Sequence, residues 1–194
     1  MKKEKGLWKA ILIPTISLFV ICAVSTVLLA FTNEITAPMI ADLAAQTAAQ
    51  TRQLVLEGAQ SFSEEKTVSL GNADYTYYEG LSDGSVVGYV FTTTSKGYGG
   101  DVEIMTGVSR GGEVTGVQTL TLNETAGLGM NAQKDSFRDQ FKGKSGQISV
   151  AKNNPGENEI QALTGATITS QAVTDAVNTA LELYQQITGG AANG

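Results

Sequence analysis

The sequence LTGATITS, residues 163–170, decides how the C-terminal part of this chain folds. Directly after it, residues 171–187 carry apolar side chains at steps of three and four, which is the period of one buried helical face. Thr169 or Ser170 is the expected N-cap of that helix, because a side-chain hydroxyl accepts hydrogen bonds from the free amides of a first turn. The stretch therefore predicts a tight turn, a hydroxyl cap and a long amphipathic helix.

The residues before the expected cap leave the backbone uncovered. Gly165 has no side chain and Ala166 has a single methyl group, so a phosphate can approach their amides together with the positive end of the helix dipole. Thr167 would lie beside such a phosphate. The pattern predicts an anion site at this turn.

The TGAT sequence at residues 164–167 resembles the flavinylation motif of the FMN-binding domains of Rnf and sodium-pumping NADH:quinone reductase complexes. The resemblance implies that Thr167 carries FMN through a phosphoester, attached by a flavin transferase during maturation. It also implies a phosphate site shaped by four neighbours: Thr164, Gly165, Ala166 and Thr169. The family often has an aspartate three residues before the motif, where this chain has Gln161.

A second segment, NETAGLG at residues 123–129, is similar to the ETPGLG segment of the same family, with Ala126 where proline is usual. Two glycines on either side of a leucine give a loop that can pass close to a flat ligand. The FRDQF sequence at residues 137–141 resembles the FxxQF helix that follows this loop in relatives. The resemblance implies that five loop residues line the ribityl chain or the ring of the flavin: Glu124, Thr125, Gly127, Leu128 and Gly129.

A third segment, KGYGGD at residues 96–101, is a glycine-rich turn that opens a predicted strand. It resembles the GYGG segment that lies near the flavin in relatives. The resemblance implies that Tyr98 packs against the isoalloxazine ring, since aromatic faces suit flat π-systems. The alternative is a turn residue whose hydroxyl faces water.

The N-terminus predicts a membrane anchor. Residues 10–31 form an apolar run without a charge, and about 20 such residues cross the hydrocarbon core of a bilayer. Lysines cluster in residues 1–9, whereas Glu34 and Asp42 follow the run, so we expect a cytoplasmic N-terminus and an extracytoplasmic main domain. A cleaved signal peptide is the alternative, but the run is long for one and lacks a clear A-x-A exit.

Composition narrows the chemistry of the outer domain. The formal net charge of the 194 residues is −6, which argues against nucleic acid as a partner. The chain has no histidine, which removes the usual haem and zinc ligands, so we expect no metal site. Its one cysteine, Cys22, lies inside the proposed membrane helix and leaves the outer domain without an internal disulfide. Electron transfer here would need an organic cofactor.

The fold class that we expect is α+β, with a twisted antiparallel sheet and packed helices. Residues 32–60 should form a membrane-proximal helix or stalk, residues 61–188 the FMN-binding domain, and residues 189–194 a flexible tail. Alternating and β-branched runs separated by Gly, Asp and Asn predict hairpins. The expected strands are residues 67–70, 75–78, 86–93, 102–108, 114–122 and 147–150, and the expected short helix is residues 135–141.

Over nearly the whole chain, the sequence resembles the G subunits of Rnf-type complexes. The resemblance implies a membrane-anchored flavoprotein that relays electrons through FMN between other subunits of an ion-pumping ferredoxin:NAD oxidoreductase, with no catalytic residue of its own. One alternative is a C subunit of a sodium-pumping NADH:quinone reductase. Another is a tethered binding or assembly module without flavin. A hydrolase is disfavoured, because nothing near Thr167 in the sequence supplies a convincing base.

Overall fold

The computed structural model describes the backbone of residues 2–189 and the side chains from residue 11 onward. Of the tail predicted at residues 189–194, only Gly189 lies within the described residues, where it ends the last helix. The chain divides into two compact units, one up to Thr47 and one from Ala48 onward, and each is described by itself.

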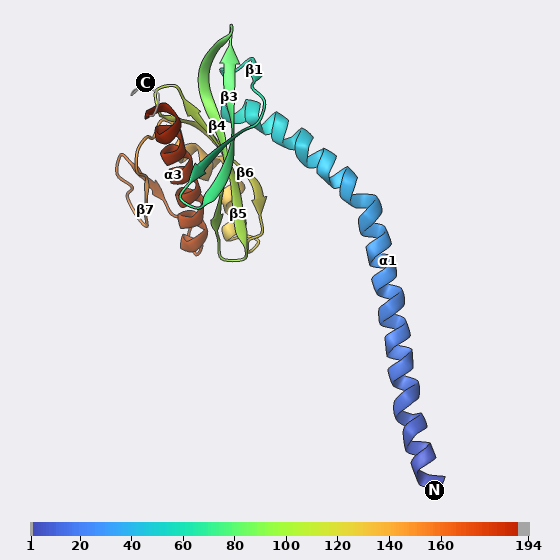
Figure 1. The fold of residues 1–194 in the computed structure, drawn as a ribbon. Helices are drawn as coiled ribbons and strands as arrows, with labels where there is room; N and C mark the ends of the chain where they lie inside the picture. Colours follow the sequence, from blue (N-terminus) through green and yellow to red (C-terminus); the bar gives the residue numbers. More distant parts are fainter. Residues whose placement is uncertain (1, 190–194) are drawn as a thin grey trace. The chain divides into compact units, whose positions relative to one another are not determined.

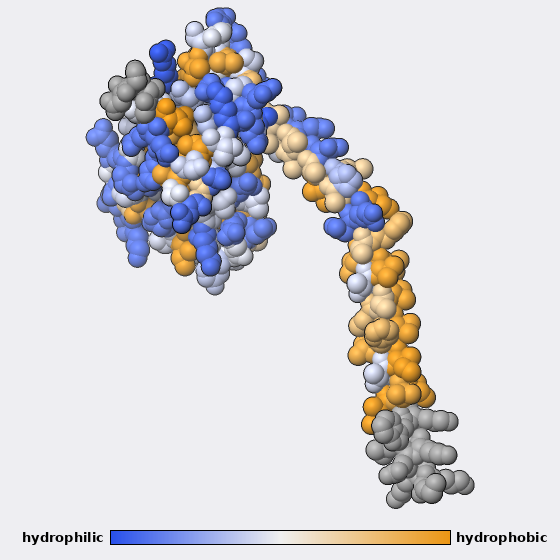
Figure 2. Space-filling model, viewed as in Figure 1, coloured by the Kyte–Doolittle hydropathy of each residue, from blue (hydrophilic) through white to orange (hydrophobic). Residues whose placement is uncertain are grey.

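The N-terminal unit consists of the greater part of helix α1 (Lys2–Val55). Residues 11–31 of α1 are exposed and present a largely apolar surface (Figure 2). By length and composition, the segment Ile11–Val55 contains a stretch apolar enough to cross a membrane.

An antiparallel sheet forms the framework of the second unit (Figure 1). Its strands follow the order β1-β3-β4-β5-β6, and β2 pairs with β3 as well. Their bounds are β1 Ser61–Phe62, β2 Lys66–Leu70, β3 Ala73–Ser82, β4 Ser85–Lys96, β5 Asp101–Ser109 and β6 Val114–Leu122. The predicted hairpins are confirmed, since β3, β4, β5 and β6 pair antiparallel in chain order. The mixture of helices and antiparallel strands confirms the α+β class. Asp83, Gly84 and Gly112 supply the positive φ angles that tight turns need.

The segment after β6 differs from prediction in its short strands. The single strand expected near residues 147–150 is β7 (Ser149–Ala151), and it pairs in parallel with an unpredicted strand, β8 (Glu159–Gln161). Three residues are too few to show a periodicity. The helix expected at residues 135–141 is confirmed as α2 (Asp135–Arg138) followed by the 3₁₀ turn η2 (Asp139–Phe141), and another 3₁₀ turn, η1 (Gly129–Gln133), precedes them.

The last helix, α3 (Thr167–Gly189), begins earlier than predicted. The prediction of Thr169 or Ser170 as its N-cap is wrong, since both lie inside the first turn and are buried. The physical reason is that a serine or threonine hydroxyl can bond to a carbonyl of the preceding turn as readily as it caps a helix. Ser170 does this, because its Oγ donates to the Ala166 carbonyl at 3.0 Å.

One face of the sheet packs against α3 and forms the larger core (Figure 1). Phe91 of β4, Ile104 of β5 and Val177 of α3 are fully buried there. Thr93 Oγ1 also donates to the Ala176 carbonyl at 2.9 Å. Burial of each such apolar side chain contributes about 1.5–3 kcal/mol, so the position of α3 on the sheet is strongly determined.

The other face packs around the end of α1. Val90 and Met105 are the chain neighbours of Phe91 and Ile104, and they point to the opposite side because side chains alternate along a strand. They form a second buried cluster with residues at the end of α1 and just after it: Val55, Leu56 and Ala59.

Glycines make room for this helix end on four successive strands: Gly80, Gly88, Gly107 and Gly116. A Cβ on Gly107 would overlap the Val55 carbonyl oxygen, and a Cβ on Gly116 would lie 2.9 Å from Val55 Cα. Thr115 Oγ1 donates to the same Val55 carbonyl, which satisfies one of the free acceptors at the helix end. The last turn of α1 is therefore part of the folded unit that carries the site.

Candidate flavin site

The site begins with the turn that precedes α3. Ala166 N donates to the Leu163 carbonyl at 3.0 Å, and Gly165, the third residue of this turn, has a φ of 76°. A type II turn requires such a positive φ at that position, which explains the glycine. Ser170 holds the turn from within the helix, since its Oγ also accepts from Leu163 N at 2.9 Å.

The first turn of α3 offers free backbone donors. Its first hydrogen bond runs from Ser170 N to the Ala166 carbonyl at 3.0 Å, so the amides of Thr167, Ile168 and Thr169 precede the helical ladder. The first turn contains no acidic residue that would compete for them. Thr167 itself is exposed. These amides and the helix dipole make the turn suitable for an anion.

A second wall is the loop after β6. Leu128 N and Met130 N both donate to the Thr125 carbonyl, at 3.1 and 3.2 Å, and this closes the loop into a compact turn. The loop then packs directly on α3, because a Cβ on Gly129 would lie 2.7 Å from Thr169 Oγ1. Only a glycine permits this approach.

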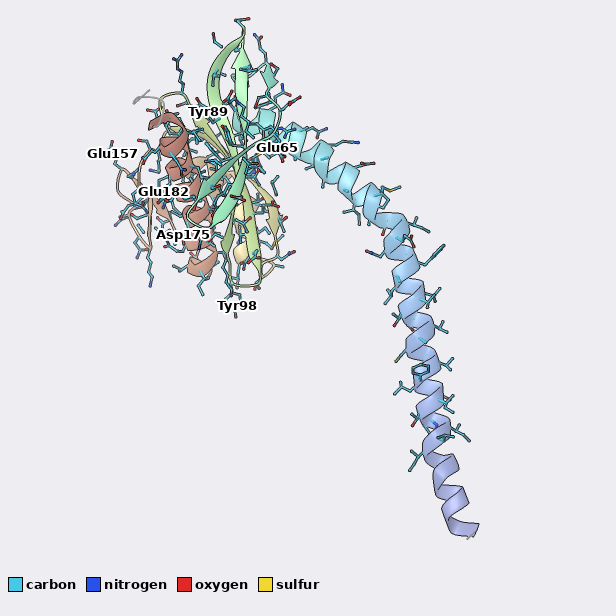
Figure 3. All side chains as sticks on the ribbon, viewed as in Figure 1. Glu65, Tyr89, Tyr98, Glu157, Asp175 and Glu182 are labelled. Carbon is cyan, nitrogen blue, oxygen red and sulfur yellow. The ribbon has the colours of Figure 1, made fainter. Side chains whose placement is uncertain are left out.

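A third wall is the turn between β4 and β5. Gly97 N donates to the Gly100 carbonyl at 2.8 Å. Glu124, from the loop after β6, accepts at Oε1 from the amides of Tyr98 at 2.7 Å and Gly99 at 3.3 Å. Tyr98 is 72% exposed at the tip of this turn (Figure 3).

The three walls enclose one cavity of about 600 Å³. Its lining residues are Tyr98, Glu124, Thr125, Leu128, Gly129, Gly165, Ala166, Thr167, Ile168 and Thr169. The structure thus brings together all the site residues predicted from the sequence except Thr164 and Gly127, which do not line it. Thr164 is the second residue of the type II turn, and Gly127 has a φ of 76° in its loop.

The cavity suits a flavin nucleotide in size and chemistry. Its volume lies within the range of about 300–1,000 Å³ that is typical of sites for small molecules. Tyr98, Leu128 and Ile168 are more than 40% exposed although they are large and apolar, so a flat ring could cover them. The free amides of α3 would meet the phosphate. Ile168 was not among the predicted site residues. The sequence placed the start of the helix at Thr169 or Ser170, so Ile168 was not recognised as part of its first turn.

Comparisons with known proteins show which family the chain belongs to. A family model described as "FMN-binding domain" matches residues 97–182, which contain all three walls. The chain is 41% identical to the G subunit of the Na⁺-translocating ferredoxin:NAD⁺ oxidoreductase complex of Acetobacterium woodii, over 93% of this chain and 94% of that protein. The chain belongs to the family of G subunits of such ion-translocating complexes.

A second G subunit, from the proton-translocating complex of Clostridium ljungdahlii, is 36% identical over 98% of this chain and 100% of that protein. The fold is also that of a solved protein, the C subunit of the Na⁺-translocating NADH-quinone reductase of Parabacteroides distasonis. The TM-score is 0.55 at 20% identity, with 70% of this chain and 89% of that chain covered. The two G subunits come from complexes named for different ions, so membership of their family does not by itself specify the ion.

In this member of the family, Gln140 of the FRDQF segment binds the strand that leads into the TGAT turn. Its Oε1 accepts from Gln161 N at 2.6 Å. The side chain of Gln161 in turn donates from Nε2 to the Lys152 carbonyl at 2.6 Å. An ionised aspartate at position 161 could not donate this bond, which gives a structural reason for the glutamine. The FRDQF segment is recognisable by resemblance, but the sequence alone predicts no role for Gln140.

Proposed function

We propose that this chain carries FMN covalently on Thr167 and relays electrons through it between other subunits of an ion-translocating ferredoxin:NAD⁺ oxidoreductase complex. The observation that carries the proposal is the position of Thr167. It is exposed, lines the cavity and opens a helix whose first three amides have no helical acceptor.

Each wall then has a defined task. The amides of Thr167, Ile168 and Thr169 bind the phosphate, and the Thr167 Oγ is the ester oxygen. The apolar side chains of Tyr98 and Leu128 provide surface for the ring. The bound flavin supplies the redox chemistry, while the protein positions it and sets its electrostatic environment. A covalent link prevents loss of the cofactor by dilution outside the cell.

Helix α1 would anchor the domain in the membrane close to its partner subunits. Residues 11–31 carry no charge, are largely apolar and are exposed, so lipid is the environment that suits them. An anchored domain keeps its flavin at a high effective concentration near the subunits that exchange electrons with it. The alternative of a quinone reductase C subunit has less support, because that likeness extends to the fold alone, whereas the G subunits match at the sequence level over nearly the whole chain.

Intact-protein mass tests the covalent link. The chain is produced with and without a flavin transferase, as the wild type and as Thr167→Ala and Thr164→Ala, and in-gel flavin fluorescence is recorded after denaturation. We expect the wild type and Thr164→Ala to gain the mass of one FMN less one water, and Thr167→Ala to gain nothing. Modification of Thr167→Ala would reject Thr167 as the attachment site. An unmodified wild type beside an active transferase would reject covalent attachment.

A further inference from the structure

Glu124 occupies a central place in the wall of the cavity. It lies in the loop after β6, yet its Oε1 accepts hydrogen bonds from Tyr98 N at 2.7 Å and Gly99 N at 3.3 Å, in the turn between β4 and β5. A carboxylate that accepts from two backbone amides binds its turn more strongly than a neutral acceptor would. Tyr98, the exposed aromatic residue of the cavity, is thus held through its own amide.

The packing around this carboxylate is close on both of its oxygens. A Cβ on Gly97 would overlap Oε1, and a Cβ on Gly129 would lie 2.8 Å from Oε2. Gly129 also lies against Thr169 in the first turn of α3, as described above. One side chain therefore contacts the turn that presents Tyr98 and the loop that packs on the helix of the attachment site.

Within the described residues, Glu124 forms no salt bridge. Among the lining residues of the cavity, it is the one with an acidic or basic side chain. The salt bridges found within the described residues involve other carboxylates. Any group that fills the cavity therefore lies beside a carboxylate whose hydrogen-bond partners are neutral amides.

We propose that Glu124 is a positioning residue that holds Tyr98 at the mouth of the cavity, and that its carboxylate lowers the midpoint potential of the flavin bound there. The second part rests on the proposed function. Reduction adds negative charge to a flavin, and a nearby carboxylate opposes that change. Glutamine at this position would keep one acceptor oxygen and remove the charge, whereas alanine would remove both.

The positioning role is tested on the full chain in detergent, produced without the flavin transferase. Hydrogen–deuterium exchange is followed by mass spectrometry on a peptide spanning residues 96–101. We expect Glu124→Ala to raise the exchange rate in this peptide about tenfold, since it loses hydrogen bonds to a charged acceptor. Glu124→Gln should restore most of the protection, and peptides from α3 should be unchanged in both variants. Wild-type protection in Glu124→Ala would overturn the positioning role.

The electrostatic role is tested on the flavinylated full chain by spectroelectrochemical titration. Glu124→Gln should have a more positive midpoint potential than the wild type. The matched control is Glu182→Gln, which removes the same charge from an exposed position of α3. Glu182 lies fifteen residues after Thr167, or about 22 Å along the helix, which exceeds the screening length of physiological salt (Figure 3).

The control should titrate like the wild type. An unchanged potential in Glu124→Gln, or an equal shift in Glu182→Gln, would overturn the electrostatic role. A wild-type chain that never gains flavin would instead reject the proposed function. The exchange experiment needs no flavin, so it decides the positioning role in either case.

Discussion

At the scale of single residues, the site depends on side chains that hold the backbone more than on side chains that point into the cavity. Ser170 is fully buried, accepts from Leu163 N and donates to the Ala166 carbonyl. It thereby fixes both ends of the turn that contains Gly165. Gln140 does the same for the preceding strand through the backbone of Gln161. These contacts position Thr167 without touching a ligand.

We expect Ser170→Ala to lower the free energy of unfolding by about 1–3 kcal/mol, because it leaves the Leu163 amide without its acceptor. Thermal unfolding of the full chain in detergent, followed by near-ultraviolet circular dichroism, measures the loss. The matched control is Thr179→Ala, which removes an exposed hydroxyl that donates to the Asp175 carbonyl on the same helix. It should change stability by less than about 0.5 kcal/mol. Equal effects of the two variants would contradict this role of Ser170.

At the scale of elements, the end of α1 is joined to β3 by side chains as well as by the row of glycines. The Arg52 guanidinium lies 4.0 Å from the centre of the Tyr78 ring. The Tyr78 hydroxyl donates to Glu65 Oε2, in the segment before β2. This arrangement connects the helix end, the central part of β3 and the edge of the sheet, and it contains an ionisable phenol.

The ionisation of this phenol should affect stability at high pH. Burial, and then the hydrogen bond to Glu65, raise the pKa of Tyr78, and burial also raises the pKa of Tyr89 on β4. A raised pKa in the folded state means that the stabilisation is fully present below the unfolded value of about 10 and is lost as pH rises through the folded value. We therefore expect the free energy of unfolding to fall above about pH 10.

Urea titrations over this pH range measure the fall, with Tyr78→Phe as the comparison. Phenylalanine cannot ionise, so the variant should lose stability less steeply above about pH 10, while Tyr89 continues to contribute. Parallel curves for the variant and the wild type would show that Tyr78 is not responsible.

At the scale of the whole molecule, the distribution of lysines bears on how the chain enters a membrane. Four lysines precede the apolar run: Lys2, Lys3, Lys5 and Lys9. Acidic residues such as Glu34 follow it. The positive-inside rule then predicts that the N-terminus stays in the cytoplasm and that the cavity faces the outside.

Protease added to intact spheroplasts should therefore digest the unit that begins at Ala48 and spare an epitope tag placed before residue 1. Replacement of the four lysines by glutamine should reduce this asymmetry. Inverted vesicles provide the control, because there the tag should be cleaved and the folded unit protected. Digestion of the tag in intact spheroplasts would contradict the proposed orientation.

Features that depend on neighbours along the chain could be predicted from the amino-acid sequence alone. Alternation and turn residues predicted the hairpins of the sheet, and β6 has the predicted bounds of residues 114–122. The uncharged run at residues 10–31 predicted the apolar helix. The three motifs led, by resemblance, to the family. Local periodicity reports which face of a strand or helix is buried, and that is enough to define such elements.

Contacts between residues far apart in the chain could not be predicted in this way. Only the fold shows that Glu124 accepts from the amides of Tyr98 and Gly99 and that Ser170 is buried instead of capping α3. The same is true of the close packing of Val55 on glycines of the sheet. The pairing of β7 with β8 belongs here too. In each case the outcome depends on which groups packing brings within hydrogen-bonding distance, and side chains of the same type can make several such contacts.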